Sequence, residues 1–202
     1  MAKTAWTRVV GVYIAATLGF VALVKIGGSL VQRQRGPAPA VEEYSRKLAL
    51  ERPTPKIPAP DFVLENASGQ KVTLQSFRGK VVFLNFWATW CFPCRREMPT
   101  MEKIYRQFRD RGLEVAAVNY KENREEVQRF FSDLGLSFTS LLDPDGAVSD
   151  QYGAWSIPLS FFIDRKGDIV AKVVGYRIWD SPESSAFFSE LLDEGLSQNV
   201  VR

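Results

Sequence analysis

The stretch Val81 to Pro99, VVFLNFWATWCFPCRREMP, contains both cysteines of this 202-residue chain. Its first eight residues, 81–88, form a nearly continuous apolar run, which predicts a strand buried on both faces of a sheet. From about Phe92 to Arg111, apolar residues recur at helical spacing, and this pattern predicts a helix that ends before Gly112. The two cysteines, with two residues between them, therefore lie between a buried strand and the beginning of a helix.

This position predicts different roles for the two sulfur atoms. The unpaired amide groups and the dipole of a helix N-terminus stabilise a thiolate, so we expect a lowered pKa for Cys91 and assign it as the nucleophile. Cys94 lies three residues further on, on the same helical face and slightly deeper, close enough for the two sulfurs to form a disulfide. Cys94 is therefore the predicted resolving thiol.

The composition excludes several other kinds of chemistry. The chain has no histidine, which removes Ser-His and Cys-His nucleophile pairs and nearly every catalytic zinc or copper site. Two cysteines supply only half of a structural zinc site, and a bridge across so short a loop adds little stability. Reversible redox chemistry without a metal or other cofactor is thus favoured over a zinc site, an inert buried pair or a structural disulfide. The net charge of +3 is spread along the chain, so no nucleic-acid partner is expected.

The N-terminal residues predict a membrane anchor. After a flank of residues 1–8, residues 9–31 are predominantly apolar and carry Lys25 as their only charge. As a helix, at about 1.5 Å per residue, they would cross a hydrocarbon core of about 30 Å. A cleaved signal peptide, with Ala38-Pro39-Ala40 as its cleavage site, and a buried soluble helix are the alternatives.

The side of the membrane on which the domain lies is not decided by charge, because basic residues flank residues 9–31 on both sides. A long domain behind a single N-terminal anchor most often lies outside the cytoplasm. We therefore expect a single-pass protein of the inner or cytoplasmic membrane, with its soluble domain on the extracytoplasmic, periplasmic side.

The remainder divides into a linker and one globular domain. Residues 32–60 are predicted to be a linker that includes a short amphipathic helix at 41–51 and four prolines within 53–60, which favour an extended spacer. The domain is expected over 61–202, with Asp180 capping its last helix. Besides the central strand and helix, we expect strands within 62–74, 113–120, 138–143, 159–163 and 169–174, and helices within 123–135, 143–153 and after 180. This order predicts an α/β sandwich around a mixed central sheet.

The segment 81–99 resembles the active-site segment of the thioredoxin superfamily. It is most similar to the membrane-anchored, extracytoplasmic branch, the TlpA/ResA-like thiol-disulfide oxidoreductases related to cytochrome c maturation reductants. The resemblance covers about residues 59–196 and implies a thioredoxin-like fold with an N-terminal strand extension. Residues 123–143 match the inserted helix and strand that distinguish this branch.

The resemblance also implies which residues surround the dithiol. Ile157 and Pro158 match the loop of the cis-proline, which offers backbone hydrogen bonds to a bound peptide, and Pro99 matches a proline that bends the active-site helix. Trp90, Phe92 and Pro93 belong to the site itself. Trp87 also matches an aromatic residue of the family, although ordinary core packing is the favoured interpretation of this tryptophan.

Three positions depart from the pattern or leave it open. Asn85 stands six residues before Cys91, where plain thioredoxins carry a buried acid, so that route for proton transfer to the deeper thiol is missing. Glu97 is interpreted either as a carboxylate that modulates the cysteines or as a solvated residue of the first helical turn. Leu159 follows Pro158 where threonine is common, which predicts a more apolar surface there.

The function implied is reduction of disulfides in client proteins, such as apocytochrome c, by a Cys91/Cys94 dithiol. A transmembrane dithiol donor would supply electrons, and the soluble domain is expected to be monomeric. The alternatives are a thiol peroxidase of the peroxiredoxin-related group, a copper metallochaperone, and a non-enzymatic anchored scaffold. The missing histidine argues against the copper protein.

Overall fold

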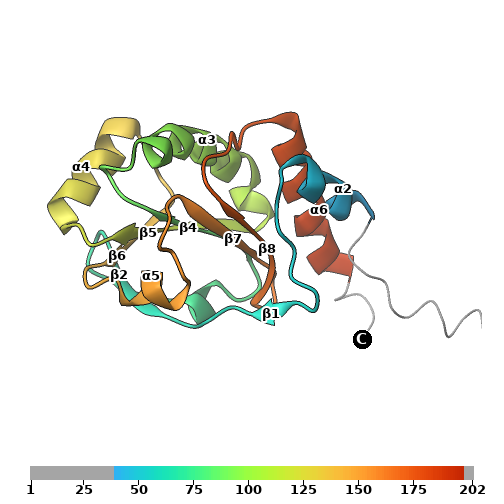
Figure 1. The fold of residues 1–202 in the computed structure, drawn as a ribbon, viewed down its shortest axis with the longest axis horizontal. Coiled ribbons are helices and arrows are strands. Elements are labelled where there is room, and N and C mark those ends of the chain that lie inside the picture. Colours follow the sequence, from blue (N-terminus) through green and yellow to red (C-terminus); the bar gives the residue numbers. More distant parts are fainter. Residues whose placement is uncertain (1–38, 198–202) are drawn as a thin grey trace, which may run out of the picture. The chain divides into compact units, whose positions relative to one another are not determined.

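The computed structural model describes residues 39–197, which form a single mixed sheet with helices on both faces (Figure 1). Within these residues the strands lie in the order β1-β8-β7-β4-β5-β6-β2-β3. Their bounds are β1 (Ile57–Pro58), β2 (Val63–Asn66), β3 (Lys71–Thr73), β4 (Val81–Trp87), β5 (Leu113–Tyr120), β6 (Thr139–Asp143), β7 (Leu159–Ile163) and β8 (Asp168–Val174). The helices are α2 (Pro39–Lys47), α3 (Phe92–Phe108), α4 (Arg124–Leu134), α5 (Ala147–Gln151) and α6 (Pro182–Ser197), with 3₁₀ turns at Leu74–Phe77 and Arg109–Arg111. The predicted flank (1–8) and anchor (9–31) lie outside the described residues.

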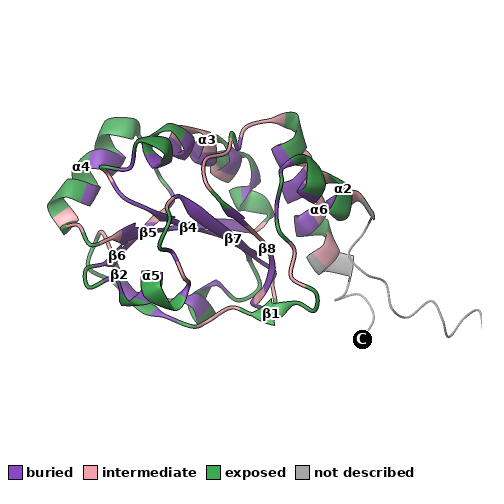
Figure 2. Cartoon of the chain, viewed as in Figure 1, coloured by how far each residue is buried: buried purple, intermediate pink, exposed green. Residues whose placement is uncertain are grey.

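Strand β4 is the centre of the sheet. It pairs in parallel with β5 and antiparallel with β7, and all seven of its residues are buried (Figure 2). Alternate side chains of a strand point to opposite faces, so Phe83 and Trp87 enter the core beneath α3 and α6, while Leu84 and Phe86 enter the core on the α5 side. The predicted mixed sheet with a doubly buried central strand is confirmed.

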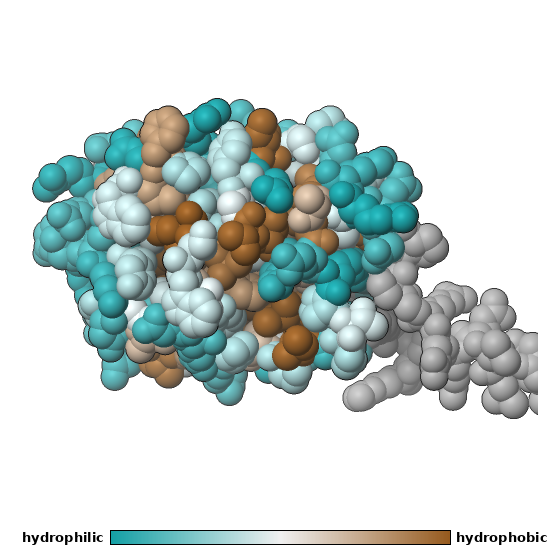
Figure 3. Space-filling model, in the orientation of Figure 1, coloured by the Kyte–Doolittle hydropathy of each residue, from teal (hydrophilic) through white to brown (hydrophobic). Residues whose placement is uncertain are grey.

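Hydrophobic side chains also lie at the surface of the domain. Figure 3 shows hydrophobic side chains reaching the surface in the middle of the visible face, with hydrophilic side chains around them. Among residues 39–197, no helix combines the length and apolar character that crossing a membrane requires.

The N-terminal boundary of the domain differs from the prediction. Residues 39–60, expected to be part of a linker, belong to the same compact unit as the rest of the described chain. Helix α2 packs against α6, Glu51 forms a β-bridge with Lys172, and β1 pairs with the edge of β8. Prolines are tolerated at a sheet edge because no ladder hydrogen bond is demanded on their outer side, so the proline-rich composition did not exclude a strand there.

The cap of α6 also differs from the prediction. The hydroxyl oxygen of Ser181, not the carboxylate of Asp180, accepts the hydrogen bond from the amide of Ser184. Asp180 instead forms an ion pair with Lys103 of α3, with 2.7 Å between Oδ2 and Nζ. The expected cap thus ties the beginning of α6 to the active-site helix.

The packing of α2 gives the first testable prediction. Val41 is completely buried in the core shared by α2 and α6, so Val41→Ala removes two buried methyl groups and leaves a cavity. We expect the free energy of unfolding to fall by about 2 kcal/mol. Urea denaturation measures it, with Val63→Ala as the control because Val63 is 62% exposed. Equal stability of the two variants would mean that residues 39–50 do not pack stably on the domain, as expected of a linker.

Candidate active site

The two cysteines form a disulfide at the N-terminus of α3. Cys91 is the N-cap residue of this helix, its Sγ accepts a hydrogen bond from the amide of Cys94 at 3.3 Å, and Pro93 occupies the first turn. Proline is suited to this position because its missing N–H would have no helical partner there. Cys91 retains slight exposure, whereas Cys94 is completely buried, which is the order of depth that the helix position predicts.

The Ile157-Pro158 loop lies directly against the dithiol. The peptide bond between these residues is cis, and the Sγ of Cys91 lies 3.8 Å from the carbonyl oxygen of Ile157. The pairing of Phe86 with Leu159 places the loop beside the end of β4, and the amide of Gly175 donates to the carbonyl of Pro158 at 2.7 Å. Two segments about 66 positions apart in the sequence are thereby brought together at one sulfur atom.

Glu97 of α3 is buried in the core. Its Oε1 accepts a hydrogen bond from the side-chain amide of Asn85 at 2.8 Å, and its Oε2 accepts from the backbone amide of Arg177 at 3.3 Å. Burial raises the pKa of Glu97 to about 7, against the smaller opposing effects of Asn85, Arg177 and the indole of Trp179. The interpretation of Glu97 as a solvated helix residue is therefore wrong.

The position of the acid explains the departure at Asn85. Asn85 also donates to the hydroxyl of Ser160 at 3.0 Å, and this strand residue thus holds a carboxylate supplied by α3. Glu97 follows Cys94 by three residues, so the two side chains share the inward face of the helix. The buried acid has not been lost, because the helix supplies it in place of the strand.

The aromatic residues around the site divide into a buried and an exposed group. Trp87 is fully buried and its ring packs 4.8 Å from that of Phe130, so its predicted role in core packing is confirmed. Trp90 and Phe92, on either side of Cys91, are 65% and 69% exposed. Two exposed aromatic rings thus flank the dithiol without being part of the hydrophobic core.

Comparison with known proteins agrees with this geometry. A family model described as the AhpC/TSA family matches residues 55–172, which is more than half of the chain. The chain belongs to the AhpC/TSA family. The predicted resemblance to TlpA/ResA-like proteins is confirmed by relatives in sequence and in structure.

Three relatives illustrate this placement within the AhpC/TSA family. A 117-residue segment, 58% of this chain, is 42% identical to the thiol-disulfide oxidoreductase ResA of Bacillus subtilis strain 168, and it covers 65% of that relative, just under two thirds. A structure described as the thiol:disulfide interchange protein DsbE from Chlorobium tepidum is 34% identical, with a TM-score of 0.62 over 72% of this chain and 99% of that one. StoA from Bacillus subtilis is 25% identical, with a TM-score of 0.54 over 68% of this chain and 98% of that one. The thioredoxin-like fold is thereby confirmed.

The contacts of Glu122 with the loop before Cys91 in this AhpC/TSA-family site were not predicted from the sequence. The carboxylate of Glu122 accepts hydrogen bonds from the amide of Thr89 at 2.7 Å, from the hydroxyl of Thr89 and from the side-chain amide of Asn119 at 2.6 Å. The carbonyl of Thr89 accepts from Nη1 of Arg95 at 3.2 Å. Every backbone and side-chain polar group of Thr89 is therefore held, which fixes the loop that leads to Cys91.

This arrangement gives a second prediction. Glu122→Gln replaces one acceptor oxygen by an amide NH2 group and removes the charge that strengthens three hydrogen bonds, so we expect the free energy of unfolding to fall by about 2 kcal/mol. Glu125→Gln is the matched control, because it removes the same charge from an exposed position three residues away. Denaturant midpoints at one pH measure both variants. A Glu122→Gln midpoint equal to that of the control would show that the loop is held by other contacts.

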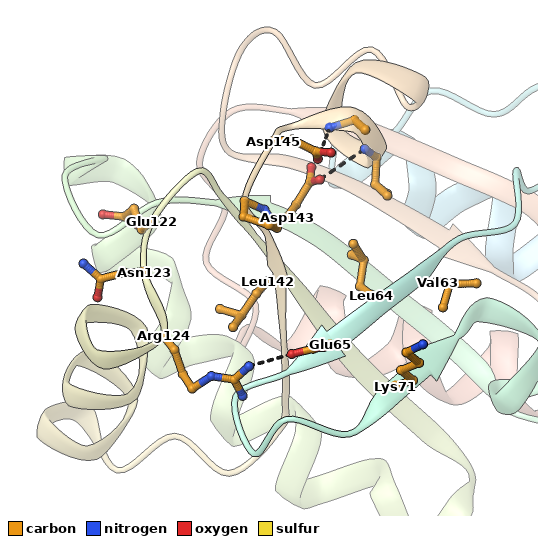
Figure 4. Close-up of a pocket in the computed structure, with 13 residues that line it drawn as sticks. Val63, Leu64, Glu65, Lys71, Glu122, Asn123, Arg124, Leu142, Asp143 and Asp145 are labelled. Atoms are coloured by element: carbon orange, nitrogen blue, oxygen red, sulfur yellow. Dashed lines mark hydrogen bonds and ion pairs between the residues drawn. The ribbon is translucent and has the colours of Figure 1, made fainter.

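A separate pocket of about 650 Å³ lies between the ends of β2 and β6 and the beginnings of α4 and α5 (Figure 4). Its charged groups are largely engaged within the protein. Arg124 pairs with Glu65 at 2.6 Å, and Asp143 accepts from the amides of Val148 and Ser149. The dithiol does not line this pocket. Among the described residues, no group of three or more Cys, Asp or Glu side chains is placed to hold a metal ion.

Proposed function

We propose that this domain is a thiol-disulfide oxidoreductase that reduces disulfides of client proteins through Cys91 and Cys94. The observation that carries the proposal is the disulfide at the N-terminus of α3, in which the more accessible sulfur, that of Cys91, accepts the amide hydrogen bond of Cys94. In the reduced protein the same amide and the helix dipole would stabilise a thiolate on Cys91. The relatives named thiol-disulfide oxidoreductase and thiol:disulfide interchange protein support this choice.

The proposed cycle transfers two electrons from the dithiol to the client. The Cys91 thiolate attacks one sulfur of a client disulfide, a mixed disulfide forms, and the other client sulfur leaves as a thiolate that takes up a proton. Cys94 then loses its proton and attacks the sulfur of Cys91, which releases the second client thiol and leaves Cys91 and Cys94 joined. Glu97, buried on the same helix face as Cys94, is the proposed acceptor of the Cys94 proton.

Reduction of a protein disulfide tests the proposal. The reduced full chain should accelerate the reduction of insulin disulfides in the presence of dithiothreitol, followed as precipitation of the insulin B chain. No acceleration, together with rapid consumption of hydrogen peroxide, would favour the thiol peroxidase alternative. Full biological function of a Cys91→Ser, Cys94→Ser double variant would favour the non-enzymatic scaffold.

We further propose that residues 9–31 anchor the domain on the extracytoplasmic side of the inner or cytoplasmic membrane. The apolar composition of this segment supports the anchor, and the single long domain behind it supports the orientation. An anchored monomer in an oxidising compartment would take electrons from a transmembrane dithiol protein and pass them to a client such as apocytochrome c. Protease digestion of intact spheroplasts tests the topology, because only an outward-facing domain is degraded.

A further inference from the structure

The surface around the dithiol carries more exposed aromatic area than the fold requires. Besides Trp90 and Phe92, Trp155 is 85% exposed, two residues before Ile157, whose carbonyl contacts Cys91. Exposed tryptophan and phenylalanine side chains are unusual on a free surface and are typical of the centres of binding surfaces. These three side chains reach the surface from both loops that meet at the dithiol.

Arg96 lies within this aromatic surface. Its guanidinium carbon is 5.9 Å from the ring centroid of Phe92 and 5.0 Å from that of Tyr176, in the loop after β8. Two aromatic contacts keep the planar group in place, while its N–H groups along the edge stay available for a ligand. Arg96 is exposed, and within residues 39–197 it has no ion pair or hydrogen bond.

The neighbouring charged groups are already engaged. Arg95 donates to the carbonyl of Thr89 and lies over the ring of Phe130. The adjacent acid, Glu97, points into the core toward Asn85, and Asp180, in the loop before α6, pairs with Lys103. The positive charge of Arg96 is therefore not compensated by either acid.

We propose that Arg96 is a specificity-determining residue that binds the carboxylate of an aspartate or glutamate close to the client's disulfide. The guanidinium fork matches a carboxylate in a bidentate fashion, and its stacking on two rings reduces the conformational freedom that binding would otherwise remove. The exposed rings of Trp90 and Trp155 would cover apolar side chains of the same client segment. This inference rests on the proposed function and adds to it the chemical class of the preferred client.

Two oxidised peptides test the inference. Each contains one disulfide in the same sequence, but one carries a glutamate beside its cysteine and the other carries glutamine there. The rate of peptide reduction by the pre-reduced full chain is measured for the wild-type protein, Arg96→Gln and Arg129→Gln. Arg129 is an exposed residue of α4 outside the site, so its variant has the same net charge as Arg96→Gln.

We expect the wild-type protein and Arg129→Gln to reduce the glutamate peptide about three to ten times faster than the glutamine peptide, with a preference that weakens as salt is added. Arg96→Gln should reduce the two peptides at equal rates. Equal rates for the two peptides with the wild-type protein, or a preference that persists in Arg96→Gln, would overturn the inference while leaving the proposed function intact. Failure to reduce either peptide would instead contradict the proposed function.

Discussion

Cys91→Ser abolishes disulfide reduction, whereas Cys94→Ser stops the reaction one step later, at a mixed disulfide between Cys91 and the client. We expect each substitution to reduce turnover roughly a thousandfold or more, because a serine hydroxyl replaces neither the attacking nor the resolving thiolate. The asymmetry follows from the structure: Cys91 is the N-cap and retains slight exposure, whereas Cys94 is completely buried. A client sulfur can approach only the first.

Mass spectrometry of the trapped species measures this asymmetry. Reduced Cys94→Ser is mixed with an oxidised client, the reaction is quenched with acid, and the adduct is located by peptide mapping. The control is the double serine variant, which should capture nothing. Capture by Cys91→Ser and not by Cys94→Ser would reverse the roles assigned to the two sulfurs, and strong activity of either single variant would contradict the proposed exchange cycle.

The dithiol and the elements on either side of it could be predicted because they depend on local patterns. A continuous apolar run can be satisfied only by a strand buried on both faces, and β4 has seven buried residues. The helix expected within 123–135 begins at such a local signal, because the side chain of Asn123 accepts from the amide of Glu126 as an N-cap. These features need information from only a few neighbouring residues.

The supporting contacts of the site could not be predicted in this way, because their partners are distant in the sequence. The burial of Glu97 depends on Asn85 from β4 and on Arg177, 80 positions away. Glu122 meets Thr89 across 33 positions, and α2 is ordered by α6 at the other end of the domain. A helical wheel did contain one signal for Glu97, which is its place on the same face as Cys94 and Met101.

The difference in the free energy of unfolding between Glu97→Gln and the wild type should change by about 3 kcal/mol as the pH rises from below 4.5 to above 7. Burial raises the pKa of Glu97 from 4.5 to about 7 in the folded protein, so the folded state binds more protons than the unfolded state between these values. The wild-type protein is therefore most stable, as far as this group is concerned, below pH 4.5, and it loses about 3 kcal/mol as the pH rises through 7. Glutamine stays neutral, so the variant lacks this loss and gains stability relative to the wild type as the pH rises.

Urea denaturation of the oxidised protein from pH 4 to pH 8 measures the difference, because the disulfide prevents the thiols from titrating. The chain has no histidine, so no side chain with an ordinary pKa near 6.5 obscures this window. The test uses only the change with pH of the difference in unfolding free energy. Any pH-independent effect of the amide on the contact with Arg177 cancels from this change. A flat difference between the wild type and Glu97→Gln would mean that Glu97 has the same pKa in the folded and the unfolded protein.

Glu102→Gln is the matched control on the same helix, because its slope should have the opposite sign. Burial raises the pKa of Glu102, but hydrogen bonds from Ser137 and the ion pair with Arg106 outweigh it, so its pKa is lowered overall. The stability that this carboxylate contributes is present above pH 4.5 and is lost as the pH falls through its folded pKa. Relative to the wild type, Glu102→Gln therefore loses stability only as the pH rises toward 4.5 and shows no further change above it, whereas Glu97→Gln gains stability between pH 4.5 and about 7. A gain in stability above pH 4.5 for Glu97→Gln and none for Glu102→Gln, from two glutamates five residues apart, would assign the effect to the surroundings of each carboxylate.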